Sequence, residues 1–169
     1  PINGQYNFLV MGGDAGADRE GLRPDSTQVI SVNAETGQAT IIGIPRDMQS
    51  IPFSADSPLW SVYPNGYNQT DGEYCTRWAC LNTLYVAAEL DHPDLYPDAV
   101  AQGSSPGVEA MKDAAEGITG LTIQYYVLID MAGLEVLINA LGGVTIDVTE
   151  RIALAIPDVP EELVEEWIE

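Results

Sequence analysis

Short apolar runs alternate with loops rich in glycine, proline and small polar residues along most of the chain. Tyr6 to Met11 is a compact apolar run that enters a Gly-Gly-Asp turn, which predicts a buried strand followed by a loop. Two β-branched runs, Ser26 to Asn33 and Ala39 to Pro45, flank the sequence Ala-Glu-Thr-Gly. This arrangement predicts a β-hairpin.

Arg77 to Leu90 places apolar residues at the three- and four-residue spacing of an amphipathic helix. Two further predicted helices are Val108 to Ile118, closed by Gly120, and Met131 to Leu141, capped by Gly142 and Gly143. The apolar runs Ile123 to Asp130 and Val144 to Val148 are predicted strands, so the chain from Ile123 onward reads strand, helix, strand. Between the hairpin and the first helix, Ile51 to Tyr74 predicts a long ordered loop, a kind of segment that often carries function.

Strands interspersed with helices predict the α/β class, as a layered α-β-α sandwich whose central mixed sheet includes the β-hairpin. The length of 169 residues and the apolar content of 46% suit a single domain over residues 1–169. The formal net charge of -20 argues against nucleic acid or anionic lipid as a sequence-independent partner, because such binding is driven by Lys and Arg. The acidity itself fits either a solvated surface or a specific cationic partner.

Four charged residues stand where the first three predicted strands begin or end, namely Asp14, Arg23, Asp25 and Arg46. If the hairpin loop comprises four residues, Asp25 lies opposite Arg46, whereas a two-residue turn would place Thr27 there instead. Both alternatives put Arg46 and Asp25 at the same end of the sheet. Asp14 reaches that end if its strand is parallel to Ala39 to Pro45 and neighbours it.

These residue types suggest binding of a phosphate through a metal. Two carboxylates can hold Mg²⁺, which completes its shell with water and phosphate oxygens. The planar guanidinium of arginine matches phosphate oxygens and stays charged at all working pH values. The alternative is a pair of surface salt bridges, Asp14 with Arg23 and Asp25 with Arg46, each contributing about 0–1 kcal/mol.

Cys75 and Cys80 are the only cysteines, and without a nearby histidine pair they make a poor zinc site. A local disulfide in an exported protein is one interpretation, and two buried free thiols are the other. On one continuous helix, residues five apart rise about 7.5 Å, which exceeds the usual reach of a disulfide. A disulfide therefore requires Cys75 to lie outside the helix that begins near Arg77.

Several ordered motifs resemble the LytR-CpsA-Psr family, and among its members the actinobacterial type. They are NFLVMGGD at 7–14, GLRPDS at 21–26, the hairpin sequence at 26–47 and YYVLIDMAGLEVLINALGGVTIDV at 125–148. The proline-rich, aromatic loop after PRDMQ and the cysteine pair favour the actinobacterial type. The resemblance covers most of the chain.

The resemblance implies an extracytoplasmic phosphotransferase, anchored in the membrane through a segment upstream of Pro1. Such an enzyme moves a polyprenyl-diphosphate-linked glycopolymer, of teichoic acid, capsule or arabinogalactan type, onto peptidoglycan with Mg²⁺ or Mn²⁺. It implies Asp14 and Asp25 as the metal carboxylates, Arg23 and Arg46 as the diphosphate-binding residues and Asp47 as an orienting partner.

The polyprenyl chain would need an apolar groove. One candidate lining is the helix 134–141, and the other is the apolar face formed by Trp78, Leu81, Leu84 and Tyr85. Packing in the core is the alternative role for both sets of residues.

One part of the family pattern is not found after Val148, namely a downstream arginine segment that completes the diphosphate site. We therefore expect the chain to lack the C-terminal part of the catalytic domain, or to have lost that part of the site. Two alternative functions follow: a non-catalytic extracellular module that binds a cell-wall glycan or lipid carrier, and a phosphohydrolase of lipid diphosphates.

Overall fold

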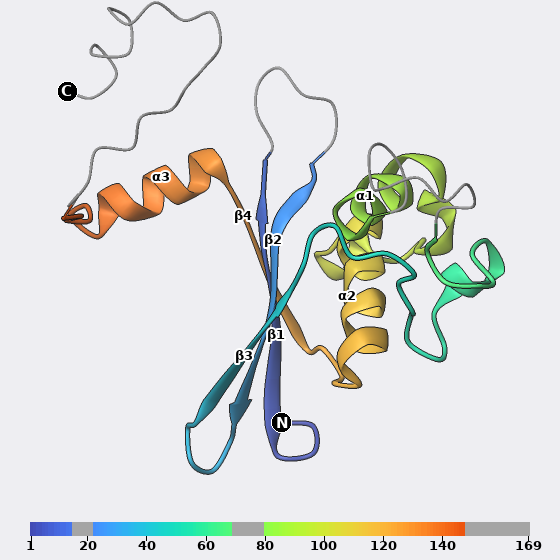
Figure 1. The fold of residues 1–169 in the computed structure, drawn as a ribbon, viewed down its shortest axis with the longest axis horizontal. Coiled ribbons are helices and arrows are strands. Elements are labelled where there is room, and N and C mark those ends of the chain that lie inside the picture. Colours follow the sequence, from blue (N-terminus) through green and yellow to red (C-terminus); the bar gives the residue numbers. More distant parts are fainter. Residues whose placement is uncertain (15–21, 69–79, 148–169) are drawn as a thin grey trace, which may run out of the picture. The chain divides into compact units, whose positions relative to one another are not determined.

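The computed structural model describes residues 1–14, 22–68 and 80–147. At its centre is a four-stranded mixed sheet in the order β3-β2-β1-β4 (Figure 1). The strands are β1 (Gln5–Gly13), β2 (Pro24–Asn33), β3 (Ala39–Ile44) and β4 (Tyr125–Asp130). β2 pairs antiparallel with β1 and β3, and β4 pairs parallel with β1. The predicted α/β class and the mixed sheet with its hairpin are confirmed.

The register of the hairpin is the one that the four-residue loop predicts. Thr27 pairs with Ile44 and Val32 pairs with Ala39, so continuing the ladder places Asp25 opposite Arg46. The side chain of Asn33 organises the turn, because its Oδ1 accepts the backbone N–H groups of Glu35 and Thr36, each at 2.9 Å. The alternative with a two-residue turn is wrong.

The position of β1 differs from the expectation. β1 and β3 run in the same direction, as predicted, but they are not neighbours, because β2 lies between them. β2 follows β1 in the chain and β3 follows β2, and each of these consecutive pairs is antiparallel. Antiparallel neighbours need only a short connection, which makes this order the simpler one.

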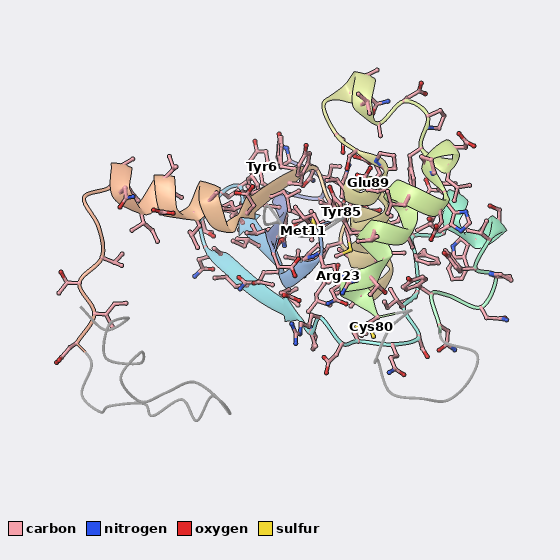
Figure 2. All side chains as sticks on the ribbon, turned by 90° about the horizontal axis from the view of Figure 1, so that it is seen from above. Tyr6, Met11, Arg23, Cys80, Tyr85 and Glu89 are labelled. Carbon is pink, nitrogen blue, oxygen red and sulfur yellow. The ribbon has the colours of Figure 1, made fainter. Side chains whose placement is uncertain are left out.

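One face of the sheet packs against helices α1 (Leu81–Val86) and α2 (Pro106–Thr119). α1 continues as a π-helical turn, Ala87–Asp91. Met11 of β1 and Tyr85 of α1 lie in the interior between the two layers (Figure 2). The core also includes the fully buried side chains of Leu9, Val29, Leu81, Leu84 and Met111.

The first predicted helix, Arg77 to Leu90, is shorter than expected within the described residues. α1 begins at Leu81, after Cys80 as its N-cap, and residues 77–79, including Trp78, lie outside the described part. Leu81, Leu84 and Tyr85 are buried in the core. Packing, rather than a lipid groove, is therefore the role of these three side chains.

α2 agrees with the predicted helix Val108 to Ile118 and is slightly longer. Ser105 caps its first turn by accepting the N–H of Val108 at 3.3 Å. Gly120 ends the helix in the left-handed conformation, with φ of 69°. Its apolar face supplies the helical layer of the core.

The loop at 51–68 packs against α2 instead of standing free. Asp113 of α2 accepts hydrogen bonds from the hydroxyls of two loop residues, Ser54 at 3.1 Å and Ser57 at 2.5 Å. Ile51 and Tyr67 close the base of the loop by exchanging backbone hydrogen bonds. Burial raises the pKa of Tyr63 in this loop to about 12, with smaller contributions from Tyr67 and Asp91. The described part of the loop is ordered, as predicted, and residues 69–74 lie outside it.

The last described elements are β4 and α3 (Met131–Ala140). The strand expected at Val144 to Val148 is wrong for its described residues 144–147, which form no strand. Its β-branched residues are insufficient without a neighbouring strand, because β-propensity reflects packing on a sheet. The chain forms two compact units, Pro1–Leu137 and Ile138–Glu169. Within the described residues, no helix combines the length and apolar character needed to span a membrane.

We predict that Gly117→Ala destabilises the protein, because a Cβ at this position of α2 would lie 2.6 Å from backbone atoms of Phe53 and Pro52. Backbone cannot yield as a side chain can, so overpacking should cost about 1–3 kcal/mol. Urea denaturation measures the change. The matched control is Gly43→Ala, whose Cβ would meet nothing within 4 Å, and which should change stability by less than about 1 kcal/mol. Equal effects of the two substitutions would contradict the close approach of the loop to α2.

Candidate functional site

The strand directions bring the four predicted site residues to one edge of the sheet. β1, β3 and β4 end at this edge, and β2 begins there. Asp14 follows the end of β1, Arg23 and Asp25 stand at the start of β2, and Arg46 lies two residues after β3. The backbone ladder therefore gathers residues that are up to 32 positions apart in the sequence.

Asp14 and Arg23 are linked through the backbone. The N–H of Asp14 donates to the carbonyl of Arg23 at 3.1 Å, and the N–H of Arg23 donates to Oδ1 of Asp14 at 3.2 Å. The pairing extends the β1–β2 ladder by one step beyond Gly13. The backbone N–H of Arg23 thus already orients the carboxylate of Asp14, so a salt bridge from the exposed guanidinium of Arg23 is not needed for this. Within the described residues this guanidinium forms no ion pair.

Asp25 and Arg46 form a direct ion pair. Nη1 of Arg46 lies 2.8 Å from Oδ1 of Asp25, and the two side chains are 60% and 39% exposed. The structure thus brings together the two residues that the hairpin register predicts to be opposite. The remaining N–H groups of Arg46 and Oδ2 of Asp25 have no hydrogen-bond partner in the described part of the chain.

A residue that the sequence analysis missed also contacts this pair. Asn82, in the first turn of α1, donates from Nδ2 to Oδ1 of Asp25 at 3.2 Å. Its backbone N–H donates to the carbonyl of Arg46 at 3.1 Å. In the sequence, Asn82 is only a polar position within an apolar helical pattern. No spacing rule connects it to the hairpin 57 residues earlier.

For the other predicted site residues, Asp47, Cys75 and Cys80, the structure does not test the predicted role. Asp47 is exposed in the turn closed by the hydrogen bond from Met48 N–H to Pro45 carbonyl at 3.1 Å, and its orienting role stays a prediction. Cys80 is buried and disulfide-bonded. Cys75 lies outside the described residues, so its pairing with Cys80 stays a prediction.

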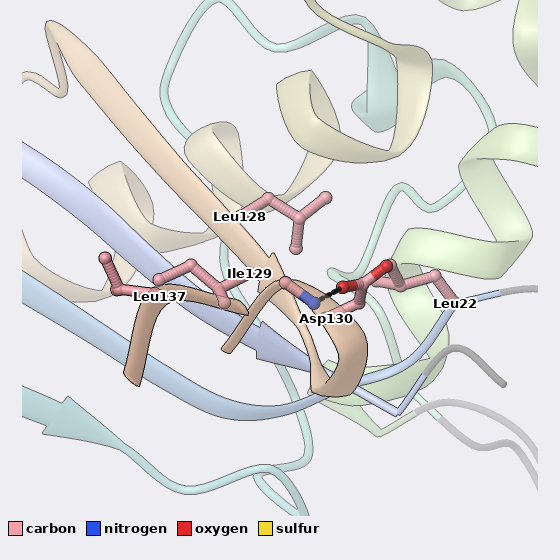
Figure 3. Close-up of a pocket in the computed structure, with 6 residues that line it drawn as sticks. Leu22, Leu128, Ile129, Asp130 and Leu137 are labelled. Carbon is pink, nitrogen blue, oxygen red and sulfur yellow. Dashed lines mark hydrogen bonds between the residues drawn. The ribbon is translucent and has the colours of Figure 1, made fainter. Parts of the chain in front are cut away.

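A cavity of about 330 Å³ opens at the same edge of the sheet, near the end of β4 (Figure 3). Its lining is largely apolar and comprises Leu22, Leu128, Ile129, Asp130, Gly133 and Leu137. Asp130 accepts the N–H of Gly133 at 2.6 Å and so caps the start of α3. Leu22 immediately precedes Arg23, and Asp130 pairs with Gly13, which precedes Asp14. The cavity therefore adjoins the charged edge.

The donor set at this edge fits a magnesium ion only in combination with a bound phosphate. Among the described residues, no group of three or more acidic, histidine or cysteine side chains is arranged to hold a metal by itself. Mg²⁺ is commonly bound through one or two carboxylates, with phosphate oxygens and waters completing its shell. Asp14 and Asp25 supply two carboxylates of this kind, and neighbouring guanidinium groups supply donors for phosphate.

Comparison with known families found one that covers nearly the whole chain. The model described as the LytR_cpsA_psr family matches residues 2–163. No match was found among curated proteins.

Two solved structures with TM-scores of 0.50 or more share the fold at low sequence identity. The chain matches protein gbs0355 from Streptococcus agalactiae with a TM-score of 0.56 and 21% identity, over 92% of this chain and 44% of that one. It matches yvhJ from Bacillus subtilis, described as a transcriptional regulator, with a TM-score of 0.50 and 19% identity, over 87% and 49%. A structure of TagT bound to LIIa-WTA matches with a TM-score of 0.48 and 19% identity, over 86% and 40%. The chain thus spans less than half the length of these structures.

We predict that the charged edge contributes little to folding. Asp25→Asn and Arg46→Gln should each change the free energy of unfolding by less than about 1 kcal/mol, because an exposed ion pair contributes about 0–1 kcal/mol. Leu84→Ala is the comparison, since it empties a fully buried position and should cost about 2–5 kcal/mol. Urea denaturation of the three variants measures the difference. A loss of several kcal/mol in Asp25→Asn would show that the pair is a structural element.

Proposed function

The chain belongs to the LytR_cpsA_psr family, and on this basis we propose that it is part of a metal-dependent phosphotransferase of the bacterial cell wall. The substrate is a glycopolymer linked to a polyprenyl diphosphate, and the acceptor is a peptidoglycan hydroxyl. The protein acts on the extracytoplasmic side of the membrane, held there by an anchor upstream of Pro1. The observation that carries the proposal is the Asp25–Arg46 pair at 2.8 Å, on the edge that also presents Asp14 and Arg23.

In this proposal the arginines bind the diphosphate. The guanidinium of Arg23 and the unused N–H groups of Arg46 donate to phosphate oxygens and offset the negative charge of the diphosphate. Asp14 and Oδ2 of Asp25 would hold Mg²⁺, or Mn²⁺ in its place. The bound ion would supply Lewis-acid stabilisation of charge on the transferring phosphoryl group.

The reaction is a displacement at the phosphorus attached to the glycan. The acceptor hydroxyl forms a new P–O bond and gives up its proton to water, while the P–O bond to polyprenyl phosphate breaks and polyprenyl phosphate leaves. The arginines hold the phosphorus in place for this attack and stabilise the charge that develops on its oxygens.

The apolar cavity supports a lipid-linked substrate. It adjoins the charged edge and is lined by Leu22, Leu128 and Leu137. A diphosphate bound by Arg23 and Arg46 would leave its first isoprene unit within reach of this cavity. Apolar burial favours the lipid by about 25 cal/mol for each Å² removed from water.

We predict that Asp14→Asn and Arg46→Ala abolish Mg²⁺-dependent binding of a polyprenyl diphosphate and transfer of its glycan. Isothermal titration with a short-chain polyprenyl diphosphate measures the binding, and attachment of labelled polymer to peptidoglycan measures the transfer. Asp98→Asn is the control, because it removes an exposed carboxylate from a different segment. Unchanged binding and transfer in both site variants would refute the proposal. Binding without transfer in the unmodified chain would favour the non-catalytic module, and release of phosphate to water would favour the phosphohydrolase.

We further predict that Leu137→Gln weakens binding of the lipid diphosphate but not of inorganic pyrophosphate. The polar amide would occupy the apolar cavity and disfavour the isoprene unit, while the charged edge stays intact. Val136→Gln is the matched control, because Val136 is 69% exposed and is not among the residues of the cavity. If Leu137→Gln weakened binding of the lipid diphosphate and of pyrophosphate equally, the isoprene unit would not bind in this cavity.

A further inference from the structure

Asn82 contacts both members of the Asp25–Arg46 pair by different groups. Its side-chain amide donates to the carboxylate of Asp25 at 3.2 Å, and its backbone N–H donates to the carbonyl of Arg46 at 3.1 Å. The orientation of the amide follows from chemistry, because an ionised carboxylate only accepts hydrogen bonds and must face Nδ2. One residue of α1 thus connects the start of β2 with the segment that follows β3.

The backbone that carries Asn82 is held by the core. Its neighbour Leu81 is 1% exposed and Leu84, one turn along α1, is 0% exposed. The N–H of Leu81 donates to the carbonyl of Met48 at 3.1 Å. The first two N–H groups of α1, which have no partner within a helix, therefore both donate to the segment 46–48 that carries Arg46.

The ion pair by itself is a weak constraint. Both side chains are substantially exposed, and exposed pairs gain little because solvent screens the charges and two long side chains lose rotamer freedom. Arg46 lies two residues beyond the end of β3, so the ladder brings it opposite Asp25 but supplies no strand hydrogen bond to hold its backbone there. A donor on a helix anchored in the core supplies the constraint that the pair lacks.

We propose that Asn82 is a positioning residue of the charged edge, which holds Asp25 and Arg46 in the arrangement that binds the diphosphate and its metal. Both donors occupy Oδ1 of Asp25. This leaves Oδ2 for a cation and the other N–H groups of Arg46 for phosphate oxygens. The inference rests on the proposed function for the identity of the ligand, but not for the role of Asn82 toward Arg46.

Residues that orient a metal-binding carboxylate commonly affect affinity by ten- to a hundredfold when they are replaced. We expect Asn82→Ala and Asn82→Asp to weaken binding of inorganic pyrophosphate in the presence of Mg²⁺ by about tenfold or more. Isothermal titration of the full chain measures this affinity. Asn82→Asp keeps the shape of the side chain, loses the donor and adds a carboxylate beside Asp25, whereas Asn82→Ala loses the donor without adding charge. An effect shared by both variants is therefore due to the lost hydrogen bond and not to packing or charge repulsion alone. Asn65→Ala, at an exposed loop position, is the control and should bind as the unmodified chain does.

A second measurement needs no ligand. The chain has only six basic residues, so the Nε–H signals of its arginines can be resolved by NMR. We expect the order parameter of Arg46 Nε to fall below about 0.6, the range of flexible groups, in both Asn82 variants, with the melting temperature unchanged within about 2 °C. A purely structural role for Asn82 would lower the melting temperature and leave Arg46 as ordered as before.

The two measurements separate the possible failures. If the unmodified chain binds pyrophosphate and both Asn82 variants bind it equally well, the positioning role is overturned. If the unmodified chain binds neither pyrophosphate nor a polyprenyl diphosphate, the proposed function fails, and the order of Arg46 alone then decides the role of Asn82. Unchanged order of Arg46 in both variants overturns it in every case.

Discussion

The register of β2 against its two neighbours is the constraint on which the structure depends. Side chains alternate between the two faces of a strand, so a shift by one residue would turn Val29 and Thr27 away from the helices. The observed register buries both with Met11 of β1 and Ile44 of β3. The same ladder, continued by one or two steps, sets Asp14 beside Arg23 and Asp25 opposite Arg46. Core packing and the charged edge are therefore consequences of one alignment.

The elements that the sequence predicted well are those whose signals are local. The hairpin register follows from its turn, where Asn33 accepts two backbone N–H groups and Gly37 takes a φ of 70°. α2 follows from its apolar spacing between a serine cap and Gly120. The errors concern pairing at long range. A single sequence does not show which strand is next to β1, or that Val144 to Asp147 has no partner, because ladder hydrogen bonds depend on residues far along the chain.

The same difference between local and long-range signals applies to the candidate site. Asp25 and Arg46 belong to one hairpin, so their proximity follows from local arithmetic. Asn82 approaches them only because α1 packs over the end of the sheet, through Leu81 and Leu84 in the core. This contact depends on tertiary packing, so neither the spacing of residues nor the composition of the chain indicates it. The cavity beside Asp130 arises likewise from β4 lying next to β1.

The turn between β2 and β3 lies at the opposite end of the sheet from the charged residues (Figure 1). Its residues 34–37 are exposed, and they contribute to the core only through the register that they set. Lengthening a surface loop costs little entropy, about 0.6 kcal/mol for each doubling. This turn is therefore a suitable place on the sheet to attach a fluorophore or an affinity tag, because a label there stands a full strand length away from Asp25 and Arg46 and leaves both free of it.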